Sequence, residues 1–261
     1  MIDWLAVCRA ATEDVRAVLA ELPSRAAREP VVGAGMGGDD TTAIDEAAER
    51  VVVARFAELD TRIVSEEVGE VGDGRWRVVI DPIDGSLNAK RGIPFFSLSV
   101  AIGDGDAMRD VFFAYVYDFG SGEEWTARAR NGAFLDGKPL RGDRPKDEIE
   151  ILSFEATLVS EVSDKAAAFD GIAYRFRIMG SLALSLCHLA AGRVDGVCSL
   201  KPYRSVDVAA AQLLVREQGL AIENVDGDGS FADAPLDLVP RSRIAAAGTD
   251  DLCRLVANGV R

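Results

Sequence analysis

The chain has 261 residues, of which 48% are hydrophobic and 7% aromatic, so it can bury one large core or two of ordinary size. Its 29 Lys and Arg residues against 43 Asp and Glu residues give a formal net charge of −14. A field of that sign repels nucleic acids and anionic membrane surfaces, so an anionic ligand would need a local source of positive charge, such as a bound metal ion.

The N-terminal segment is expected to form an amphipathic helix. Its apolar residues, from Ile2 to Leu22, recur at steps of three and four, and Pro23 follows them. The first ten residues contain Asp3 and lack the basic start and long apolar run of a signal peptide. No stretch approaches the roughly 18 uninterrupted apolar residues of a membrane span. We therefore expect a cytoplasmic protein.

Residues 33–38 form a glycine-rich segment that satisfies the dinucleotide-binding pattern GxGxxG. That pattern needs a buried strand before it and an acidic residue on a following strand, and the sequence offers neither. A loop over the active site is the better interpretation, because glycine permits closure at low steric cost. A second helix is expected to begin near Thr42.

The middle of the chain is rich in short β-type runs, and we expect a mostly antiparallel sheet there, with helices packed on it. The dipeptides Asn131-Gly132 and Asp136-Gly137 indicate tight turns. The expected strands are residues 62–64, 76–80, 96–102 and 111–117.

The polar stretch from Arg141 to Glu148 is interpreted either as a linker between two halves or as a long surface loop within one domain. Beyond it, strands near Ile151 and Tyr174 alternate with helices near Ser181 and Val208. This alternation indicates an α/β second half.

The most informative segment is an apolar strand that runs directly into Asp81-Pro82-Ile83-Asp84-Gly85-Ser86. Asp81 and Asp84 on one tight turn would lie close together, and like charges so placed raise each other's pKa unless a cation neutralises them. Oxygen ligands of this kind suit a hard ion such as Mg²⁺. Gly85 and Ser86 then open a helical turn whose N–H groups can hold an anion. Metal ligands therefore lead directly into a candidate phosphate site.

Further carboxylates lie at the ends of other predicted elements. Glu66 and Glu67 follow the Ile63-Val64 strand, and Asp207 opens an apolar helix. Each feature has an ordinary explanation by itself: a solvated acidic pair, a helix N-cap for Asp207, and a type I turn for residues 81–86. Their combination in this order favours a metal site over coincidence.

These residues resemble the inositol monophosphatase superfamily of Mg²⁺-dependent phosphatases. The matching motifs are a Glu-Glu pair, a D-P-[IL]-D-G-[ST]-x-N block, a late Asp before small residues, a Thr-x-x-Asp motif and a Gly-Ser pair before a helix. They stand at Glu66-Glu67, residues 81–88, residues 207–210, residues 42–45 and Gly180-Ser181. The run NAKRGIPFFSLSVA is most similar to the archaeal-type enzymes that act on both fructose 1,6-bisphosphate and inositol 1-phosphate.

One segment departs from that archaeal-type group. Where its members usually show G-M-G-A-D-G-T-P-T, this chain reads GMGGDDTT from Gly35 to Thr42. The shorter run leaves open which of Asp39 and Asp40, if either, assists a third ion.

The resemblance implies a mixed α+β fold, a layered αβαβα sandwich of the sugar-phosphatase type. We expect residues 1–145 to form the metal- and phosphate-binding α+β half, with a mostly antiparallel sheet. Residues 146–261 would form a smaller α/β half that completes the active site. The resemblance also implies a homodimer that acts on a small phosphorylated metabolite. The net charge of −14 argues against a nucleic-acid or membrane partner.

Two or three Mg²⁺ ions per active site are implied by the resemblance. Glu66, Asp81 and the Ile83 carbonyl would hold one ion, and Asp81 would share a second with Asp84 and Asp207. The implied reaction is hydrolysis of a phosphomonoester by metal-activated water.

The resemblance also implies catalytic roles for Asp45, Glu66 and Ser86. Asp45 and Glu66 would assist a weaker third ion. The Ser86 hydroxyl, paired with Asp45, would orient the attacking water.

Residues that bind the rest of the substrate are expected around the same site. The candidate donors are Arg177 and the cluster Lys201-Pro202-Tyr203-Arg204. Lys201 stands where archaeal-type enzymes usually carry Arg, and it lacks the bidentate geometry of Arg. Arg177 and Lys201 are equally well explained as surface cations, and Leu182 as a core residue. The expected substrate-binding set is Asp84, Gly85, Ser86, Arg177, Ser181, Leu182 and Lys201.

The soft metal ligands of the chain give no competing site. The single histidine, His188, lies in an apolar helical run, so we expect a partly buried helix residue and no zinc centre. The four cysteines show no metal-ligand spacing, and Cys8 and Cys187 are expected to be buried, reduced thiols.

Two other functions stay open. A nucleotide phosphatase acting on adenosine 3′,5′-bisphosphate would use a similar site, although the short link from Glu66 to Asp81 counts modestly against it. A non-catalytic regulatory protein of the same fold would be indicated by the loss of a ligand carboxylate. The sequence retains all of them: Asp45, Glu66, Asp81, Asp84 and Asp207.

Overall fold

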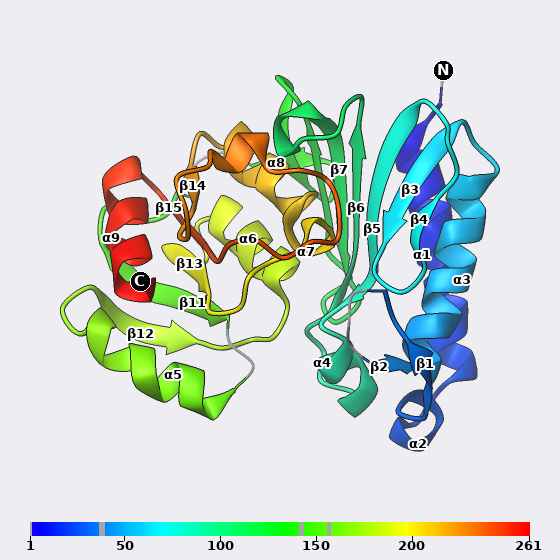
Figure 1. Ribbon diagram of the computed structural model, residues 1–261, viewed down its shortest axis with the longest axis horizontal. Helices are drawn as coiled ribbons and strands as arrows, with labels where there is room; N and C mark the ends of the chain where they lie inside the picture. The colour runs from blue at the N-terminus through cyan, green and yellow to red at the C-terminus, as the bar shows by residue number, and fades with distance from the viewer. Residues whose placement is uncertain (1, 37–39, 141–143, 156–157) are drawn as a thin grey trace.

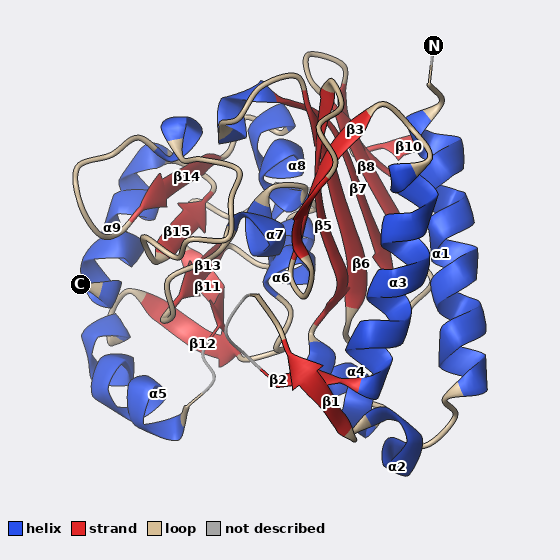
Figure 2. Ribbon diagram, turned by 45° about the vertical axis from the view of Figure 1, so that its right-hand side comes forward, coloured by secondary structure: helices blue, strands red, loops and turns tan. Residues whose placement is uncertain are grey.

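The computed structural model describes residues 2–36, 40–140, 144–155 and 158–261. Two large β-sheets and the helices around them form five layers in the order helix, sheet, helix, sheet, helix (Figure 1). Figure 2 shows the first sheet between its two helical layers. The mixed α+β sandwich expected from the sequence is confirmed.

The first sheet has eight strands in the order β10-β9-β8-β7-β6-β5-β3-β4. Every neighbouring pair is antiparallel except β3 and β5, which run parallel. Its central strands are continuous apolar runs because helices cover both faces, and every residue of β6 is buried. The strands are β3 (Thr61–Ser65), β4 (Gly69–Val71), β5 (Trp76–Asp84), β6 (Ser97–Gly103), β7 (Val111–Asp118), β8 (Glu124–Arg128), β9 (Gly132–Leu135) and β10 (Lys138–Pro139).

The second sheet has five strands in the order β12-β11-β13-β15-β14. Strand β11 runs parallel to both of its neighbours, and the remaining pairs are antiparallel. The carboxyl end of β11 therefore lies beside the carboxyl ends of β12 and β13. The strands are β11 (Ile149–Glu155), β12 (Ala173–Arg177), β13 (Gly196–Ser199), β14 (Ala221–Asn224) and β15 (Ile244–Ala247).

The helices form three layers around these sheets (Figures 1 and 2). The outer face of the first sheet carries α1 (Trp4–Glu21) and α3 (Ala43–Ala57). The middle layer contains α6 (Leu182–Ala190), α7 (Ser205–Val208) and α8 (Ala211–Glu217), and the far side of the second sheet carries α9 (Asp250–Val260). The remaining described α-helices and strands are α2 (Arg25–Arg28), α4 (Ser86–Arg91), α5 (Val159–Ala166) and the two-stranded ribbon β1 (Val31–Ala34) with β2 (Asp40–Thr42).

Three apolar clusters fill the spaces between these layers. Phe56 belongs to the cluster between α1, α3 and the first sheet, and Trp125 to the cluster between the two sheets. Phe154 belongs to the third cluster, which includes residues of the second sheet and α9. All three side chains are fully buried, so the two sheets are held together through a continuous middle core and not through a thin linker.

Most elements lie where the sequence predicts them. The first helix begins after Asp3, whose carboxylate accepts a hydrogen bond from the backbone N–H of Ala6 at 3.2 Å. Asp136 and Gly137, both with positive φ, form the two-residue turn between β9 and β10. The second helix begins directly after Thr42, as expected.

Three expectations need correction. Strand β5 does not end at Ile80 but continues to Asp84, because an irregularity between Asp81 and Asp84 allows pairing with β6 to resume. The helix expected at Asp207 begins earlier, at Ser205, and α7 and α8 are separate elements. The glycine-rich segment is not a loop throughout, since its first two residues belong to β1; residues 37–39, including Asp39, lie outside the described residues.

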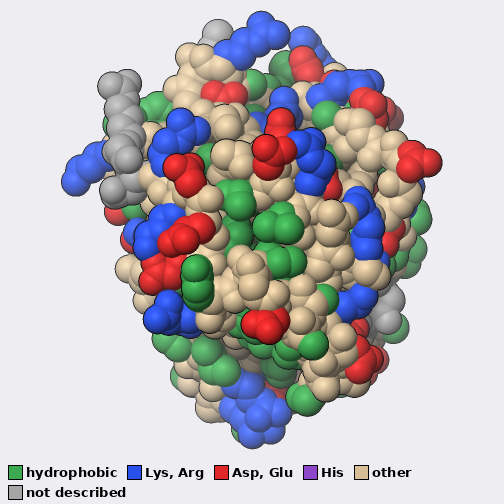
Figure 3. All heavy atoms as spheres, turned by 90° about the vertical axis from the view of Figure 1, so that its left-hand side faces the viewer, with side chains coloured by type: hydrophobic (Ala, Val, Ile, Leu, Met, Phe, Trp, Pro, Cys, Tyr) green, Lys and Arg blue, Asp and Glu red, His purple; other side chains and the backbone are tan. Residues whose placement is uncertain are grey.

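The surface carries both signs of charge despite the strongly negative total. On the face that includes α9 and α5, basic and acidic side chains lie side by side, and this view shows no continuous basic patch (Figure 3). Ion pairs such as Arg254 with Asp251 and Arg243 with Asp226 contribute to this pattern. Among the described residues, no helix has both the length and the apolar character needed to cross a lipid bilayer.

Candidate active site

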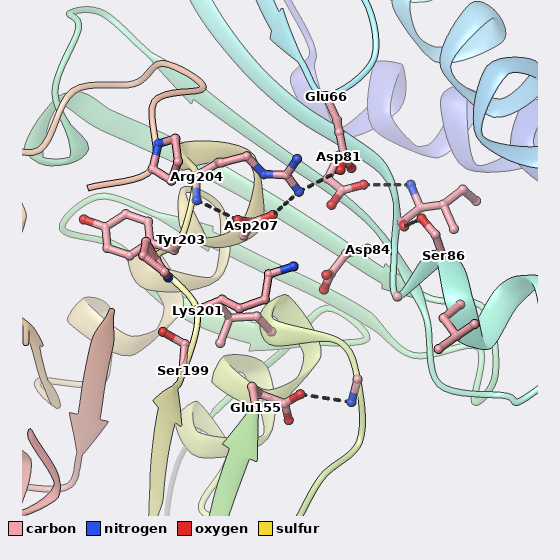
Figure 4. A pocket seen from close by; sticks show the side chains of 17 residues that line it. Glu66, Asp81, Asp84, Ser86, Glu155, Ser199, Lys201, Tyr203, Arg204 and Asp207 are labelled. Atoms are coloured by element: carbon pink, nitrogen blue, oxygen red, sulfur yellow. Dashed lines mark hydrogen bonds and ion pairs between the residues drawn. The ribbon is translucent and has the colours of Figure 1, made fainter. Parts of the chain in front are cut away.

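The predicted site residues meet at a cavity of about 490 Å³ between the first sheet and the second half of the chain. It is called the main cavity below. Figure 4 shows carboxylates from the first sheet on one side and Lys201, Glu155 and Ser199 on the other. Of the predicted residues, those that line it are Glu66, Asp81, Ile83, Asp84, Gly85, Ser86, Leu182, Lys201 and Asp207.

Three predicted residues stand outside this lining. Ser181 lies behind it, where its hydroxyl donates a hydrogen bond to Asp84. Arg177 is exposed and its guanidinium donates to the carbonyl of Phe176, so the structure does not bring it to the main cavity. Asp45 lines a second, small cavity beside the main one.

Glu66, Asp81, Asp84 and Asp207 form what we call the acidic cluster. Glu66 follows the end of β3, which pairs in parallel with β5, so both strands end at the same edge of the sheet. The β5 irregularity places both Asp81 and Asp84 at this edge, and the Ile83 N–H donates to Asp81 Oδ1 at 3.0 Å. Asp207 reaches the same cavity from α7. The cluster therefore depends on three separate elements of the fold.

The acidic cluster is short of positive charge. Burial raises the pKa of Asp81 well above its usual range, and the nearby Glu66 and Asp84 raise it further. Burial likewise raises the pKa of Glu66 to about 7, where Arg204 opposes the shift and Asp207 adds to it. Burial raises the pKa of Asp84 to about 7, against the hydrogen bond from Ser181. Such a cluster favours a bound cation, which would stabilise the ionised carboxylates.

One guanidinium supplies part of that charge. Arg204 Nη2 lies 2.7 Å from Glu66 Oε1 and 3.2 Å from Asp207 Oδ1, as the dashed lines in Figure 4 show. Burial acts to lower the pKa of Arg204, but Asp207 and Glu66 raise it above its usual value. Arg204 therefore remains charged and holds two predicted metal ligands that lie far apart in the sequence.

The donor chemistry of the acidic cluster fits a hard divalent cation. All of its side chains offer carboxylate oxygens, the ligands that Mg²⁺ prefers. In the described part of the chain, however, no three acidic, histidine or cysteine side chains are spaced as a ready-made metal cage. The ion pairs of Arg204 with Glu66 and Asp207 give a physical reason, since the guanidinium occupies oxygens that an ion would use.

The small cavity has a volume of about 10 Å³, close to what one water molecule needs. It is lined by Asp45, Glu66, Asp81 and Ser86 among others. Asp45 Oδ2 accepts hydrogen bonds from Thr42, whereas its buried Oδ1 has no hydrogen-bond partner among the described residues. The expected pairing of Ser86 with Asp45 is not seen, because the Ser86 hydroxyl donates to the Ile83 carbonyl at 3.0 Å.

Backbone from the two halves of the chain meets at the start of α4. Gly85 has a left-handed φ of +94°, and a Cβ there would lie 3.1 Å from the Gly180 carbonyl oxygen. Glycine is needed at this position for both its conformation and its small size. Asn88 joins the same two segments, donating to the carbonyls of Met179 at 2.7 Å and Phe95 at 2.8 Å.

Two buried carboxylates around the site were missed in the sequence. Glu49 on α3 accepts from the backbone N–H groups of Glu67 at 2.9 Å and Val68 at 3.2 Å, which fixes the turn after Glu66. Glu155 ends β11 and accepts from Gly180 N at 3.0 Å. The available signal was a charged residue on an apolar face or at the end of an apolar strand.

The soft ligands of the chain play no part in this site. His188 packs against the rings of Phe95 and Trp125, and burial lowers its pKa. All four cysteines are described, buried and outside any disulfide. The expected buried state of Cys8 and Cys187 is confirmed.

Sequence and fold are both similar to known proteins. The profile of the inositol monophosphatase family matches residues 4–260. A fructose-1,6-bisphosphatase/inositol-1-monophosphatase from Thermococcus kodakarensis is 32% identical over 237 residues, which cover 88% of this chain and 86% of that protein. The Nus factor SuhB from Escherichia coli is 33% identical over 208 residues, which cover 74% of each chain. A crystal structure of an inositol monophosphatase–fructose 1,6-bisphosphatase has a TM-score of 0.86 at 25% identity, covering 99% of this chain and 100% of that one.

Proposed function

The chain belongs to the inositol monophosphatase family, and from this we propose that it is a Mg²⁺-dependent phosphomonoesterase that hydrolyses inositol 1-phosphate, fructose 1,6-bisphosphate or both. The observation that carries the proposal is the acidic cluster, whose four carboxylates line one cavity next to the start of α4. Similarity to a relative named as a phosphatase supports the choice of reaction.

The acidic cluster would hold the metal ions. Glu66, Asp81 and the Ile83 carbonyl are proposed ligands of one ion, and Asp81, Asp84 and Asp207 of another. Bound divalent ions would supply the positive charge that lowers the pKa of a water molecule and neutralises the phosphate and the leaving oxygen. Because Arg204 now pairs with Glu66 and Asp207, loading requires that guanidinium to give up at least part of its contacts.

The phosphate group is proposed to lie against Gly85 and Ser86, at the start of α4. Glycine at position 85 lets this turn pack against the carbonyl oxygens of Gly180 and Phe95, each 3.1 Å from where a Cβ would lie. The first turn of a helix directs N–H groups outward, so this position favours an anion. Ser86 stays within reach of the same anion through its hydroxyl, which donates to Ile83 O in the structure.

Asp45 is the proposed acceptor for the attacking water. Its Oδ1 faces no other donor among the described residues, and the small cavity beside it has room for one water molecule. A water held there would lie among Asp45, Glu66 and Ser86, which line the small cavity together. Asp45 would then fix the direction from which the water approaches the phosphorus atom.

The rest of the substrate would fill the side of the main cavity away from Asp45. Lys201 and Ser199 lie on this side, and in Figure 4 the Lys201 side chain extends toward Asp84. Leu182 also lines the main cavity. Lys201 would contact a hydroxyl group or a second phosphate as a point charge. Arg177 has no such position, so Lys201 is the cation that we propose for substrate binding.

A regulatory role is the second candidate function, because one similar protein is named as a Nus factor. A purely regulatory protein would not require a cluster of buried carboxylates whose negative charge is only partly neutralised. Measured turnover with a divalent ion therefore separates the two candidates.

Phosphate release is the direct test. Purified protein would be assayed with inositol 1-phosphate, fructose 1,6-bisphosphate and adenosine 3′,5′-bisphosphate, each with Mg²⁺ and with a chelator. We expect turnover of at least one of the first two substrates in Mg²⁺ and none with the chelator. Turnover of the nucleotide alone would move the assignment to a nucleotide phosphatase, and no turnover of any substrate would favour the regulatory role.

The homodimer and the cytoplasmic location expected from the sequence remain predictions. Light scattering coupled to size-exclusion chromatography would measure the mass of the particle directly. A mass of about 28 kDa, that of one chain of 27.9 kDa, would contradict the dimer.

A further inference from the structure

Glu155 is a buried carboxylate at the wall of the main cavity that has no place in the proposed reaction. It ends β11 in the second sheet, its exposed fraction is 8%, and burial raises its pKa. Burying a carboxylate is costly unless several donors compensate it, so its partners indicate what it does.

The partners of Glu155 are neutral donors on its own half of the chain. Oε1 accepts from the hydroxyls of Ser185 at 2.7 Å and Ser153 at 2.9 Å. Oε2 accepts from Gly180 N at 3.0 Å, the bond drawn in Figure 4. With three donors bound, the carboxylate is directed toward the Gly180 turn and not toward the acidic cluster.

The Gly180 turn leads directly to Asp84. Gly180 has a φ of +85°, and Ser181 after it caps α6 by accepting from Leu184 N at 3.3 Å. The Ser181 hydroxyl donates to Asp84 Oδ2, and Ala183 N donates to the same oxygen at 2.9 Å. Both bonds fall on Oδ2, so Oδ1 is the oxygen that Asp84 can present to a cation.

We propose that Glu155 is a positioning residue for the metal ligand Asp84, acting through the Gly180-Ser181 turn at the start of α6. It fixes the turn, the turn places the two donors, and the donors fix the rotation of the Asp84 carboxylate. In this way β11 of the second sheet sets the geometry of a ligand on β5 of the first. The inference rests on the proposed function, because it requires Asp84 to bind a metal ion. Outer contacts of this kind typically change metal affinity by about 10- to 100-fold when they are lost.

Asp195 provides a matched control. It is also a buried carboxylate, 5% exposed, that fastens β11 by accepting backbone N–H groups, from Lys146 at 2.8 Å, Glu150 at 3.1 Å and Ile151 at 3.0 Å. These bonds lie at the opposite end of the strand from Glu155. Loss of Asp195 should therefore weaken the second sheet without reaching Asp84.

The test is the affinity of the full chain for Mg²⁺, measured by isothermal titration calorimetry without substrate. In Glu155→Ala we expect binding to weaken about 10-fold or more. Glu155→Gln keeps an oxygen that can accept from Gly180 N. This conservative variant should therefore retain most of the Mg²⁺ affinity that Glu155→Ala loses. Asp195→Asn should lower Tm while the Mg²⁺ affinity stays at the wild-type value.

A double-variant comparison tests the route through Ser181. If Glu155 acts through that turn, the double variant Glu155→Ala/Ser181→Ala should bind Mg²⁺ about as well as Ser181→Ala alone. Its loss of affinity should be much smaller than the product of the fold-losses of the two single variants. Independent, multiplicative losses would contradict the route.

The possible outcomes separate this inference from the proposed function. If the wild-type protein binds no Mg²⁺, the proposed function itself is contradicted. Wild-type protein that binds Mg²⁺, with Glu155→Ala and Glu155→Gln binding it equally well, would overturn only the positioning role. If Glu155→Ala does not fold, Glu155→Asp decides in its place. Its side chain is one methylene shorter and withdraws from Gly180 N, so it should bind Mg²⁺ more weakly than Glu155→Gln. Equal Mg²⁺ affinities of Glu155→Asp, Glu155→Gln and the wild type would contradict the inference.

Discussion

Buried carboxylates occur in two regions of this molecule, and the two groups differ in the partners that compensate their charge. Around the site and along β11, Glu49, Glu155 and Asp195 each accept at least two hydrogen bonds from neutral N–H or O–H donors. In the acidic cluster, Glu66, Asp81, Asp84 and Asp207 lie beside one another, with the guanidinium of Arg204 as a shared partner of two of them. The first group is complete without any ligand, whereas the second has an excess of negative charge.

This difference indicates which carboxylates serve structure and which serve function. A carboxylate that is fully bonded to neutral donors holds those donors in place and has little to offer an ion. Carboxylates whose pKa values are raised by burial and by each other weaken the metal-free fold, and they gain most from a cation. The contrast predicts opposite responses to mutation in the two regions.

The largest expected effect comes from exchanging charge for an amide in each region. Asp81→Asn should lower kcat/KM by at least about a thousandfold, because metal contacts supply several kcal/mol and each 1.4 kcal/mol is about tenfold. The Tm of the metal-free protein should stay the same or rise, since one repelling charge is gone. Asp195→Asn should do the reverse, with a lower Tm and unchanged kcat/KM. Phosphate-release kinetics and thermal unfolding of both variants measure this. A drop in Tm for Asp81→Asn without loss of activity would contradict the division into structural and functional carboxylates.

Arg204 should be essential for stability only when no metal is bound. Arg204→Gln leaves Glu66 and Asp207 without their shared cation, and breaking a largely buried ion pair costs about 3 kcal/mol of unfolding free energy. Saturating Mg²⁺ should restore most of that loss. Urea unfolding with a chelator and with Mg²⁺ gives both numbers.

Arg193→Gln is the matched control for Arg204. The Arg193 side chain pairs with Glu123 but is 38% exposed, so its loss should cost no more than about 1 kcal/mol, with or without metal. An equal loss in the two variants, unaffected by Mg²⁺, would contradict the special role of the Arg204 pairs.

The pH dependence of stability sharpens the same contrast. Glu66 and Asp84 release their protons near pH 4 in the unfolded chain, but their pKa values are raised to about 7 in the folded, metal-free protein. The folded state therefore binds more protons between these values, so unfolding free energy falls as pH rises from about 4 to about 7. We expect a loss of several kcal/mol over this range with a chelator, and a much smaller loss with Mg²⁺. Urea unfolding at several pH values would show it, and a flat metal-free profile would count against the charge excess.

The smallest expected effect concerns substrate binding at the opposite wall of the main cavity. Lys201→Ala should raise KM by up to about fivefold with little change in kcat, because an exposed cation contributes no more than about 1 kcal/mol. Arg177→Ala is the control, since Arg177 does not line the main cavity, and its kinetics should match the wild type. A larger change in Arg177→Ala than in Lys201→Ala would reverse the assignment.

The local part of the site was predictable from the sequence. The segment from Asp81 to Ser86 carries two ligands, the glycine and the hydroxyl within six positions, so spacing along the chain already implies closeness in space. Strand and helix positions followed from apolar periodicity, and the αβαβα sandwich followed from the family resemblance. The division of the chain between residues 145 and 146 stays a prediction.

The parts that could not be predicted depend on backbone groups or on residues far apart in the chain. The ion pair of Arg204 with Glu66 joins two segments that only the folded chain brings together. Glu49 and Glu155 accept hydrogen bonds from backbone N–H groups of other segments. Since nearly every residue carries a backbone N–H group, the sequence does not indicate which ones they bind. The separation of α7 from α8 falls in an alanine run of high helix propensity, so the local preference of the sequence predicts no break there.

The most direct test of the acidic cluster as a metal centre is a crystal grown with saturating Mn²⁺, which accepts the same oxygen ligands as Mg²⁺ and scatters anomalously. We expect anomalous peaks next to Asp81, each also next to Glu66, Asp84 or Asp207, and an Arg204 guanidinium that no longer bridges Glu66 and Asp207. The absence of any peak at these oxygens, with Arg204 still paired as it is here, would show that the acidic cluster is not a metal centre.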